Sequence, residues 1–298
     1  MTTHESNGGI PSWVIMPVMS NQALTEAALS DCLAQSVPVR VLVILQGVAG
    51  ELRQHIERIA EQEPRLLVWS HDPPLPSLSA TWNRALQFVW AVGGTEALVV
   101  NNDVRLHAET YRMLRLAREQ TSALFVSAVG VDTEAQTMGW SVDLTYIAAS
   151  RGGPDFSCFL ISKSCHERYR FDEGFVPLYG EDCDYHRRLM LAGDGDKIFS
   201  INLPYHHIGG GSQTLKALSK EQREALERRI GNSRMYYASK WGTGGINKET
   251  FTIPFDAASA QAGVTNPELQ AAVLGHGASR DTADDDESRA TPDSTVSC

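Results

Sequence analysis

The feature that most constrains the fold is an alternation of two hydrophobic patterns between residues 13 and 100. Short apolar runs suited to buried strands alternate there with segments whose apolar residues recur at helical spacing. The runs cover residues 13–18, 37–45, 66–69 and 97–100, and the helical segments cover 25–35, 51–61 and 79–92. Strands that alternate with helices pair in parallel. We therefore predict an α/β fold whose Rossmann-like, mostly parallel central sheet carries helices on both faces.

The pattern changes after residue 120. Apolar runs at 124–129, 144–148 and 156–161 are separated by turns rich in Gly, Pro and Asp. This predicts a mixed, partly antiparallel second half. Further helices are expected at 181–191, where the first turn is acidic, and at 216–230.

The composition divides the chain into one domain and two polar ends. Hydrophobic residues make up 42% of the 298 positions, which is enough for a sizeable core. Residues 11–250 are expected to form the domain, with a nucleotide-binding half at 11–105 and an acceptor half at 106–250. The polar residues 1–10 and the acidic, Ala- and Asp-rich tail at 251–298 are expected to be mostly disordered.

Charge and cysteine content narrow the class of protein. The net charge of −10 disfavours long contact with the phosphates of duplex nucleic acid. The five cysteines include no CxxC pair, which argues against a disulfide framework or a structural zinc site. We find neither the pattern of a signal peptide nor an apolar run approaching the roughly 18 residues of a membrane span. The expected localisation is cytoplasmic.

Carboxylates occur at two places where chemistry is expected. Asp103, with Asn101 and Asn102, follows an apolar strand, and ligands of open α/β sheets bind at the carboxyl ends of strands. A carboxylate there can hold Mg²⁺ or Mn²⁺ against a diphosphate, although a simple turn is the alternative. Glu181 and Asp182 begin a predicted helix, where mutual repulsion and the helix dipole can tune a general base. Ordinary helix-start acids are the alternative for this pair.

A third group of polar residues lies near residue 206. His206 and His207 precede three glycines, and a neutral imidazole is a common metal ligand. A flexible glycine loop with incidental histidines is the alternative. The aromatic segment 232–242 is interpreted as a helix that docks on the domain.

The order of these segments resembles the inverting, metal-dependent, family-2-like glycosyltransferases of the GT-A fold. Phe171-Asp-Glu-Gly-Phe followed by Gly180-Glu-Asp-Cys-Asp is the most specific part. The resemblance extends from about residue 13 to 242 through the segments 14–18, 28–35, 80–85, 98–104, 153–161, 171–189, 207–212 and 232–242.

The resemblance implies a nucleotide-sugar donor linked to UDP, dTDP or GDP, and a divalent cofactor, Mn²⁺ or Mg²⁺. It makes Asp182 the base, supported by Glu181, and makes Asp103 the metal ligand together with His207, or alternatively His206. Donor contacts are implied for Pro17, Gln46, Asn83, Arg84, Asn101, Asn102 and Asp103. Acceptor contacts are implied for Asp184, Phe175 and Tyr179. A glycan, a glycolipid, a protein or a hydroxylated DNA base would supply the acceptor hydroxyl.

Two departures from the family pattern concern the donor. The family usually has an Asp-rich turn after its second strand, whereas this chain has Gln46, which weakens the preference for uridine. The first position of the metal motif is Asn101 instead of Asp, so Asp103, helped by His207, must bind the metal ion without a second carboxylate from this motif.

Three other classes of protein are disfavoured. A nucleotidyltransferase on a related sheet lacks support because no Gly-rich, basic loop follows the first strand. A non-catalytic sugar-nucleotide-binding protein would not need Glu181, Asp182 and the histidine pair. A dehydrogenase is disfavoured because no GxGxxG motif follows a strand.

Overall fold

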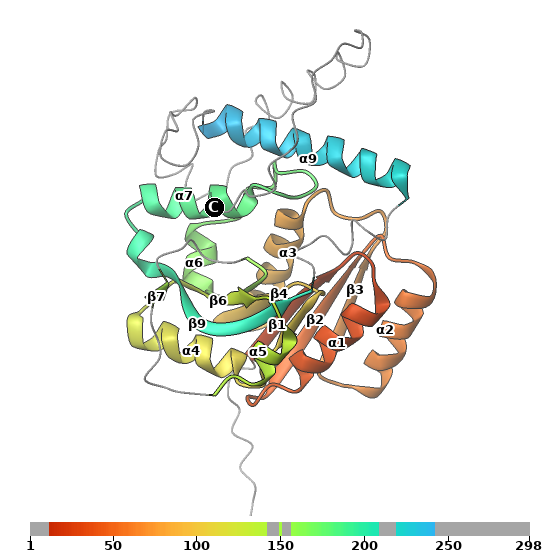
Figure 1. Cartoon of the computed structure of the whole chain (residues 1–298), viewed down its shortest axis with the longest axis horizontal. Coiled ribbons are helices and arrows are strands. Elements are labelled where there is room, and N and C mark those ends of the chain that lie inside the picture. The colour runs from red at the N-terminus through yellow and green to blue at the C-terminus, as the bar shows by residue number, and fades with distance from the viewer. Residues whose placement is uncertain (1–11, 142–148, 151–155, 209–218, 242–298) are drawn as a thin grey trace, which may run out of the picture.

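The computed structural model describes residues 12–141, 149–150, 156–208 and 219–241. They form one nine-stranded sheet with helices on both faces (Figure 1). The strand order is β3-β2-β1-β4-β8-β6-β9-β5, and β7 pairs with β9. The predicted α/β class is confirmed. The predicted strand at 144–148 and the two polar ends lie outside the described residues.

Four parallel strands build the first half of the sheet. They are β1 (Ser12–Val18), β2 (Val39–Gln46), β3 (Leu66–His71) and β4 (Glu96–Val100). The crossover helices are α1 (Gln22–Leu33), α2 (Gly50–Gln62) and α3 (Leu78–Ala91). Every residue of β1 is buried. Burial on both faces explains why the strand appears in the sequence as a continuous apolar run instead of an alternating one.

The sheet changes direction beyond β4. The next strand in space is β8 (Cys158–Ser162), which is antiparallel to both β4 and β6 (Phe125–Val131). The long strand β9 (Ile198–His207) is parallel to β6 but antiparallel to β5 (Val104–Leu106) and β7 (Ala149–Ser150). The predicted mixed second half is therefore confirmed. The predicted boundary between residues 105 and 106 falls within β5, so both halves share one sheet.

Two predicted helices and several others complete the chain. The predicted helix at 181–191 is α7 (Glu181–Leu191). The predicted helix at 216–230 corresponds to α9 (Lys220–Trp241), which runs on through the aromatic segment. The sequence analysis did not predict α4 (Thr110–Thr121), α5 (Glu134–Met138), α6 (Lys163–Arg168) or the 3-10 turn η1 (Gly195–Lys197). Within the described chain, no helix combines the length and the apolar character that crossing a membrane requires.

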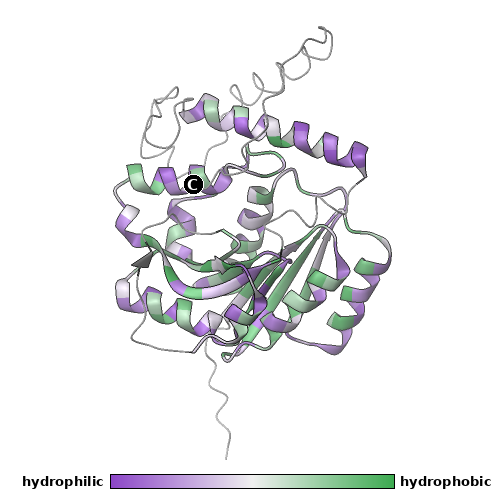
Figure 2. Ribbon diagram, viewed as in Figure 1, coloured by the Kyte–Doolittle hydropathy of each residue, from purple (hydrophilic) through white to green (hydrophobic). Residues whose placement is uncertain are grey.

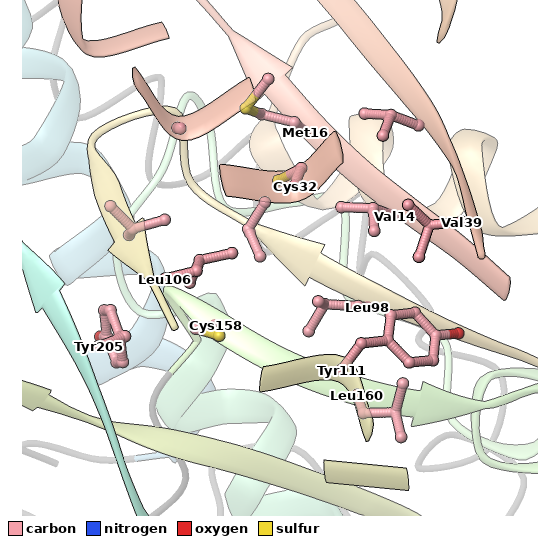
Figure 3. Close-up of a cluster of buried hydrophobic side chains, with 14 of the residues drawn as sticks. Val14, Met16, Cys32, Val39, Leu98, Leu106, Tyr111, Cys158, Leu160 and Tyr205 are labelled. Carbon is pink, nitrogen blue, oxygen red and sulfur yellow. The ribbon is translucent and has the colours of Figure 1, made fainter. Parts of the chain in front are cut away.

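Each face of the sheet has its own hydrophobic core. Val14, Met16 and Leu98 pack against α1, α2 and α4, and Figure 3 shows part of this mostly aliphatic core. On the opposite face, Trp13 and Trp82 belong to a more aromatic core that includes residues of α3, α6 and α7. Successive side chains of a strand point to opposite faces, which is why neighbours in β1 enter different cores. Figure 2 shows apolar strands at the centre and polar residues on the outer sides of the helices.

Candidate active site

The N-terminus of α7 is positioned by a glycine. Gly180 precedes the helix with a φ of 91°, a left-handed conformation that L side chains rarely adopt. A Cβ atom at this position would lie 3.0 Å from the ring of Phe175. The turn therefore needs glycine, and it places Glu181 and Asp182 in the first turn of α7.

The two acids of the predicted catalytic pair have different environments. Glu181 is only 6% exposed, whereas Asp182 is half-buried and accepts a hydrogen bond from Cys183 N over 2.7 Å. Burial, followed by the charge of Asp182, raises the pKa of Glu181 to about 8. The backbone N–H groups of Glu181 and Tyr179 act in the opposite direction but are outweighed. At neutral pH the pair therefore consists of a protonated Glu181 and an adjacent Asp182.

Asp184, one helical turn further on, is fully buried in a network of charges. Lys240 Nζ of α9 lies 2.6 Å from Asp184 Oδ1 and 2.6 Å from Asp172 Oδ2. Arg188 Nε donates to Asp184 Oδ2 over 2.8 Å, and Trp241 Nε1 donates to Oδ1 over 2.8 Å. Burial alone would raise the pKa of Asp184, but Lys240 and Arg188 lower it. These contacts favour a structural role for Asp184 over the predicted acceptor contact.

The two aromatic residues predicted to line the acceptor site also differ. Phe175 is fully buried and packs edge-on against Tyr236 of α9, with ring centroids 4.9 Å apart. Tyr179 is 38% exposed and lies directly before the acids of α7. Of the two, Tyr179 is the residue that an acceptor can reach.

The second part of the site joins β5 and β9. His207 Nε2 lies 3.1 Å from Asp103 Oδ1, and the backbone N–H of Ile208 donates to the carbonyl of Asp103 over 2.9 Å. His207 is the register partner of Val104, and His206 is the partner of Arg105. Because neighbouring side chains of a strand point to opposite faces, only one histidine can face Asp103. The structure therefore favours His207 over His206 as the predicted metal ligand.

Tyr179 connects the two parts. Burial raises its pKa, the carboxylates of Glu181, Asp103 and Asp182 add to that effect, and Arg234 of α9 opposes it. Acids from two motifs that are separate in the sequence therefore act electrostatically on one tyrosine.

The Asp103–His207 pair is the candidate metal site. In the described part of the chain, no group of three or more His, Cys, Asp or Glu side chains is arranged to hold a metal ion. The pair offers one oxygen and one nitrogen ligand. This fits a Mn²⁺ or Mg²⁺ ion that takes its other ligands from a bound diphosphate and water, as nucleotide-bound ions commonly do.

Gln46 is the residue of the predicted donor site with the clearest free hydrogen-bonding capacity. It is 7% exposed, and its Oε1 accepts a hydrogen bond from Leu75 N over 2.8 Å. Its Nε2 is buried and has no partner among the described residues, and the same holds for Nε2 of His71, its register partner in β3. His71 was not among the residues predicted from the sequence. Its position two residues after the predicted strand 66–69 was the signal that could have identified it.

Asn83 and Asn102 have structural contacts. The side chain of Asn83 is buried, donating to Phe171 O over 2.8 Å and to Glu173 Oε1 over 2.9 Å. Its Oδ1 also lies 3.0 Å from His166 Nε2. Asn102 Nδ2 donates to Ser20 O over 2.8 Å, which ties the end of β4 to the start of α1. These contacts position the segments around the site, and direct donor binding by either residue stays a prediction.

The other three predicted donor residues show no contact that decides their role. Pro17 is buried in β1, Arg84 is exposed on α3, and Asn101 is partly exposed after β4. The backbone N–H of Asn101 donates to Ser157 O over 3.0 Å.

Comparison with known proteins gives similarity at the level of structure only. No protein-family model matches the sequence, and none of the curated proteins matches it significantly. The mannosyltransferase PcManGT from Pyrobaculum calidifontis, in complex with GDP-Man and Mn²⁺, has a TM-score of 0.55 and 16% identity. That match covers 90% of this chain and 75% of PcManGT.

Two further solved structures are similar. S. aureus TarS 1-349 gives a TM-score of 0.52 at 13% identity and covers 91% of this chain and 88% of that one. Glucosyl-3-phosphoglycerate synthase from Mycobacterium tuberculosis, with Mn²⁺, UDP-Glc and glycerol 3-phosphate, gives 0.51 at 14% identity, covering 84% and 88%. Against a longer structure of TarS, the match covers only 43% of that chain. These likenesses concern the fold.

Proposed function

We propose that this chain, which has the fold of the GT-A glycosyltransferases, transfers a sugar from a nucleotide-sugar donor to an acceptor hydroxyl with inversion. The observation that carries the proposal is that the Asp103–His207 contact and the Glu181–Asp182 pair both place acids whose charges act on Tyr179. One pair suits a metal-bound diphosphate and the other suits proton removal from an acceptor. A glycosyl transfer of this kind needs both.

The donor would lie over the carboxyl ends of the parallel strands. Gln46 Nε2 and His71 Nε2 are buried polar atoms without partners, suited to hydrogen bonds with the nucleotide. PcManGT is bound to GDP-Man and Mn²⁺, and the mycobacterial synthase to UDP-Glc and Mn²⁺. Both support a diphosphate-linked sugar and a divalent ion here, held by Asp103 and His207. That ion would neutralise the negative charge that grows on the leaving diphosphate.

Asp182 is the proposed base because it is the partly exposed member of its pair. It would take the proton of the acceptor hydroxyl as that oxygen attacks the anomeric carbon and the bond to the diphosphate breaks. Attack opposite to the leaving group inverts the anomeric centre.

The acceptor is proposed as a hydroxyl-bearing glycan, glycolipid or protein. A hydroxylated DNA base fits less well because the chain carries a net charge of −10. The mycobacterial synthase was crystallised with glycerol 3-phosphate, which makes small phosphorylated alcohols worth including among test acceptors.

The experiment is a turnover assay with UDP-glucose, UDP-GlcNAc, GDP-mannose and a dTDP-sugar, each with Mn²⁺, with Mg²⁺ and with EDTA. We expect metal-dependent release of a nucleoside diphosphate from at least one donor, with an inverted product. Binding of a donor without turnover would instead indicate a sugar-nucleotide-binding protein. Release of pyrophosphate from a nucleoside triphosphate and a sugar phosphate would indicate a nucleotidyltransferase.

A further inference from the structure

Glu181 differs from every other acid around the site in having a buried oxygen without a partner. It is 6% exposed, and its Oε2 has no hydrogen bond among the described residues. Asp184, which is buried more completely, accepts hydrogen bonds from Arg188 and Trp241 and pairs with Lys240. Depth of burial therefore does not explain the difference. The two acids differ in the side chains that donate hydrogen bonds to them, because Asp184 has several such partners and Glu181 Oε2 has none among the described residues.

The charged groups around Glu181 do not compensate a negative charge on it. Asp182 and Asp184 lie on the same helix, and the phenol of Tyr179 lies in the preceding segment. Asp103, directly before β5, raises the pKa of Tyr179, and Arg234 of α9 lowers it. Two cations near α7 are already engaged, since Arg188 binds Asp184 and Lys240 bridges Asp172 and Asp184. In the described part of the chain, no Lys or Arg forms an ion pair with Glu181.

A buried carboxyl group without a cation keeps its proton, because burying the uncompensated charge would cost several kcal/mol. This agrees with the rise of the pKa of Glu181 to about 8. A protonated carboxyl group has one O–H that donates. Burying that donor without an acceptor is itself unfavourable, so the group is suited to an oxygen that arrives with a substrate.

We propose that Glu181 stays uncharged during the reaction and donates a hydrogen bond to a hydroxyl oxygen of the acceptor, beside the hydroxyl whose proton Asp182 removes. The proposal rests on the function proposed above. Glu181 keeps its proton throughout, and Asp182 receives the only proton that moves to the protein. The two neighbours thus have opposite hydrogen-bonding roles, and the acceptor is one that carries two neighbouring hydroxyls.

The first test compares Glu181→Gln with Glu181→Ala at pH 7, with UDP-glucose and GDP-mannose as donors and glycerol, a vicinal diol, as the acceptor. Glutamine keeps the shape and an N–H donor, so transfer should stay within about fivefold of wild type. Alanine loses the donor, and transfer should fall at least about tenfold. Wild-type transfer should also decline as the pH rises above 8, and Glu181→Gln should lack that decline. Equal losses in both variants, or the same decline in Glu181→Gln, would overturn the proposal.

The second test does not depend on activity. The protonated form stabilises the fold, so this stability is complete below the unfolded-state pKa of about 4.3 and is lost as the pH rises through about 8. The Tm of Glu181→Gln should therefore equal that of wild type at pH 5 and exceed it at pH 9. Glu119→Gln, which changes an exposed glutamate, is the charge-matched control and should show a constant difference.

The two tests separate the two proposals. A Tm difference for Glu181→Gln that stays constant from pH 5 to 9 would show that Glu181 is charged and would overturn the inference, even in an active transferase. If wild-type protein turns over none of the four donors of the turnover assay, the proposed function fails and the substrate contact fails with it. The Tm comparison would then still decide the charge of Glu181.

Discussion

The proposed donor half and the proposed acceptor half of the site are stabilised by different forces. In the donor half, residues 12–105, four parallel strands are packed between two apolar cores, and Asp103 lies where the strands end. In the acceptor half, the described residues from 106 to 241, the segment leading into α7 is tied to α9 by Asp172, Asp184 and Lys240.

The difference follows from what each half must hold in place. Apolar burial has no direction, so it fixes a sheet without orienting any single polar group. Charged hydrogen bonds are directional and short, so they can orient the first turn of a helix. The acids of α7 therefore depend on a lysine that lies more than fifty residues further along the chain, at the end of α9.

The largest expected effect separates chemistry from binding. Asp182→Asn removes the proposed base from the acceptor half, and transfer should fall about 10³-fold to 10⁴-fold. Donor affinity, which depends on the other half, should stay within about twofold by calorimetry. An equal loss of transfer and donor affinity would show that the base is misassigned and that the two halves do not divide the work.

The next prediction compares how much stability the fold loses when one interaction in each half is removed. Lys240→Met should lower the free energy of unfolding by about 3–5 kcal/mol, because it leaves Asp172 and Asp184 buried without their shared cation. Leu98→Ala in the apolar core should cost about 2–5 kcal/mol. Both are measured by urea denaturation.

The pH dependence distinguishes these two losses. Because the folded-state pKa of Asp184 is lowered, its stabilising contribution is present above the unfolded-state pKa of about 3.9 and is lost as the pH falls through the folded-state value. The cost of Lys240→Met should therefore shrink below about pH 4, whereas that of Leu98→Ala should not. If the stability loss of both variants depends on pH in the same way, the two halves are not stabilised by different forces.

In the proposed function, metal binding depends on the contact between Asp103 of the proposed donor half and His207 of the proposed acceptor half. Asp103→Asn and His207→Gln should each raise the Mn²⁺ concentration for half-maximal turnover at least about tenfold. His206→Gln, whose side chain points to the other face of β9, should change it less than about twofold. If His206→Gln has the larger effect, the assignment of the ligand to His207 is wrong.

The smallest expected effect lies in the donor half alone. Gln46→Glu keeps an oxygen for Leu75 N but removes the N–H donors of the amide. The KM for the donor should rise about threefold to tenfold, with kcat nearly unchanged, because a single hydrogen bond is worth about 1 kcal/mol. An unchanged KM would indicate that Gln46 supports the loop at Leu75 and does not contact the donor.

The features that could be predicted from the sequence are those that leave a local pattern in the chain, such as strands and helices. The four parallel strands follow from continuous runs of apolar residues, and the helix at 181–191 follows from its acidic first turn. Asp103 drew attention because it follows a strand, and Asp182 because it lies at the start of a helix. The helix α4 escaped prediction, although Tyr111, Leu114 and Ala117 form an apolar stripe that could have revealed it.

Other features depend on pairings between distant segments. The insertion of β8 between β4 and β6 is a matter of topology that spacing along the chain does not encode. The same holds for Lys240, whose partners Asp172 and Asp184 appeared in the sequence to belong to the acidic catalytic motif. A local sequence pattern can point to an acid such as Asp184, but it does not show which distant residue forms the ion pair with it.

The doubled histidine at the end of β9 gives the site a tolerance to errors of strand pairing. His207 faces Asp103 only because β9 pairs with β5 in one register. A slip of one residue exchanges the two faces of a strand and would turn His207 away. In one direction of slip His206 would take its place, so an imidazole would stay beside Asp103, whereas the opposite slip would bring Ile208 there. A one-residue insertion in β9 before His206 is therefore a change that the pair can absorb, and a deletion is not.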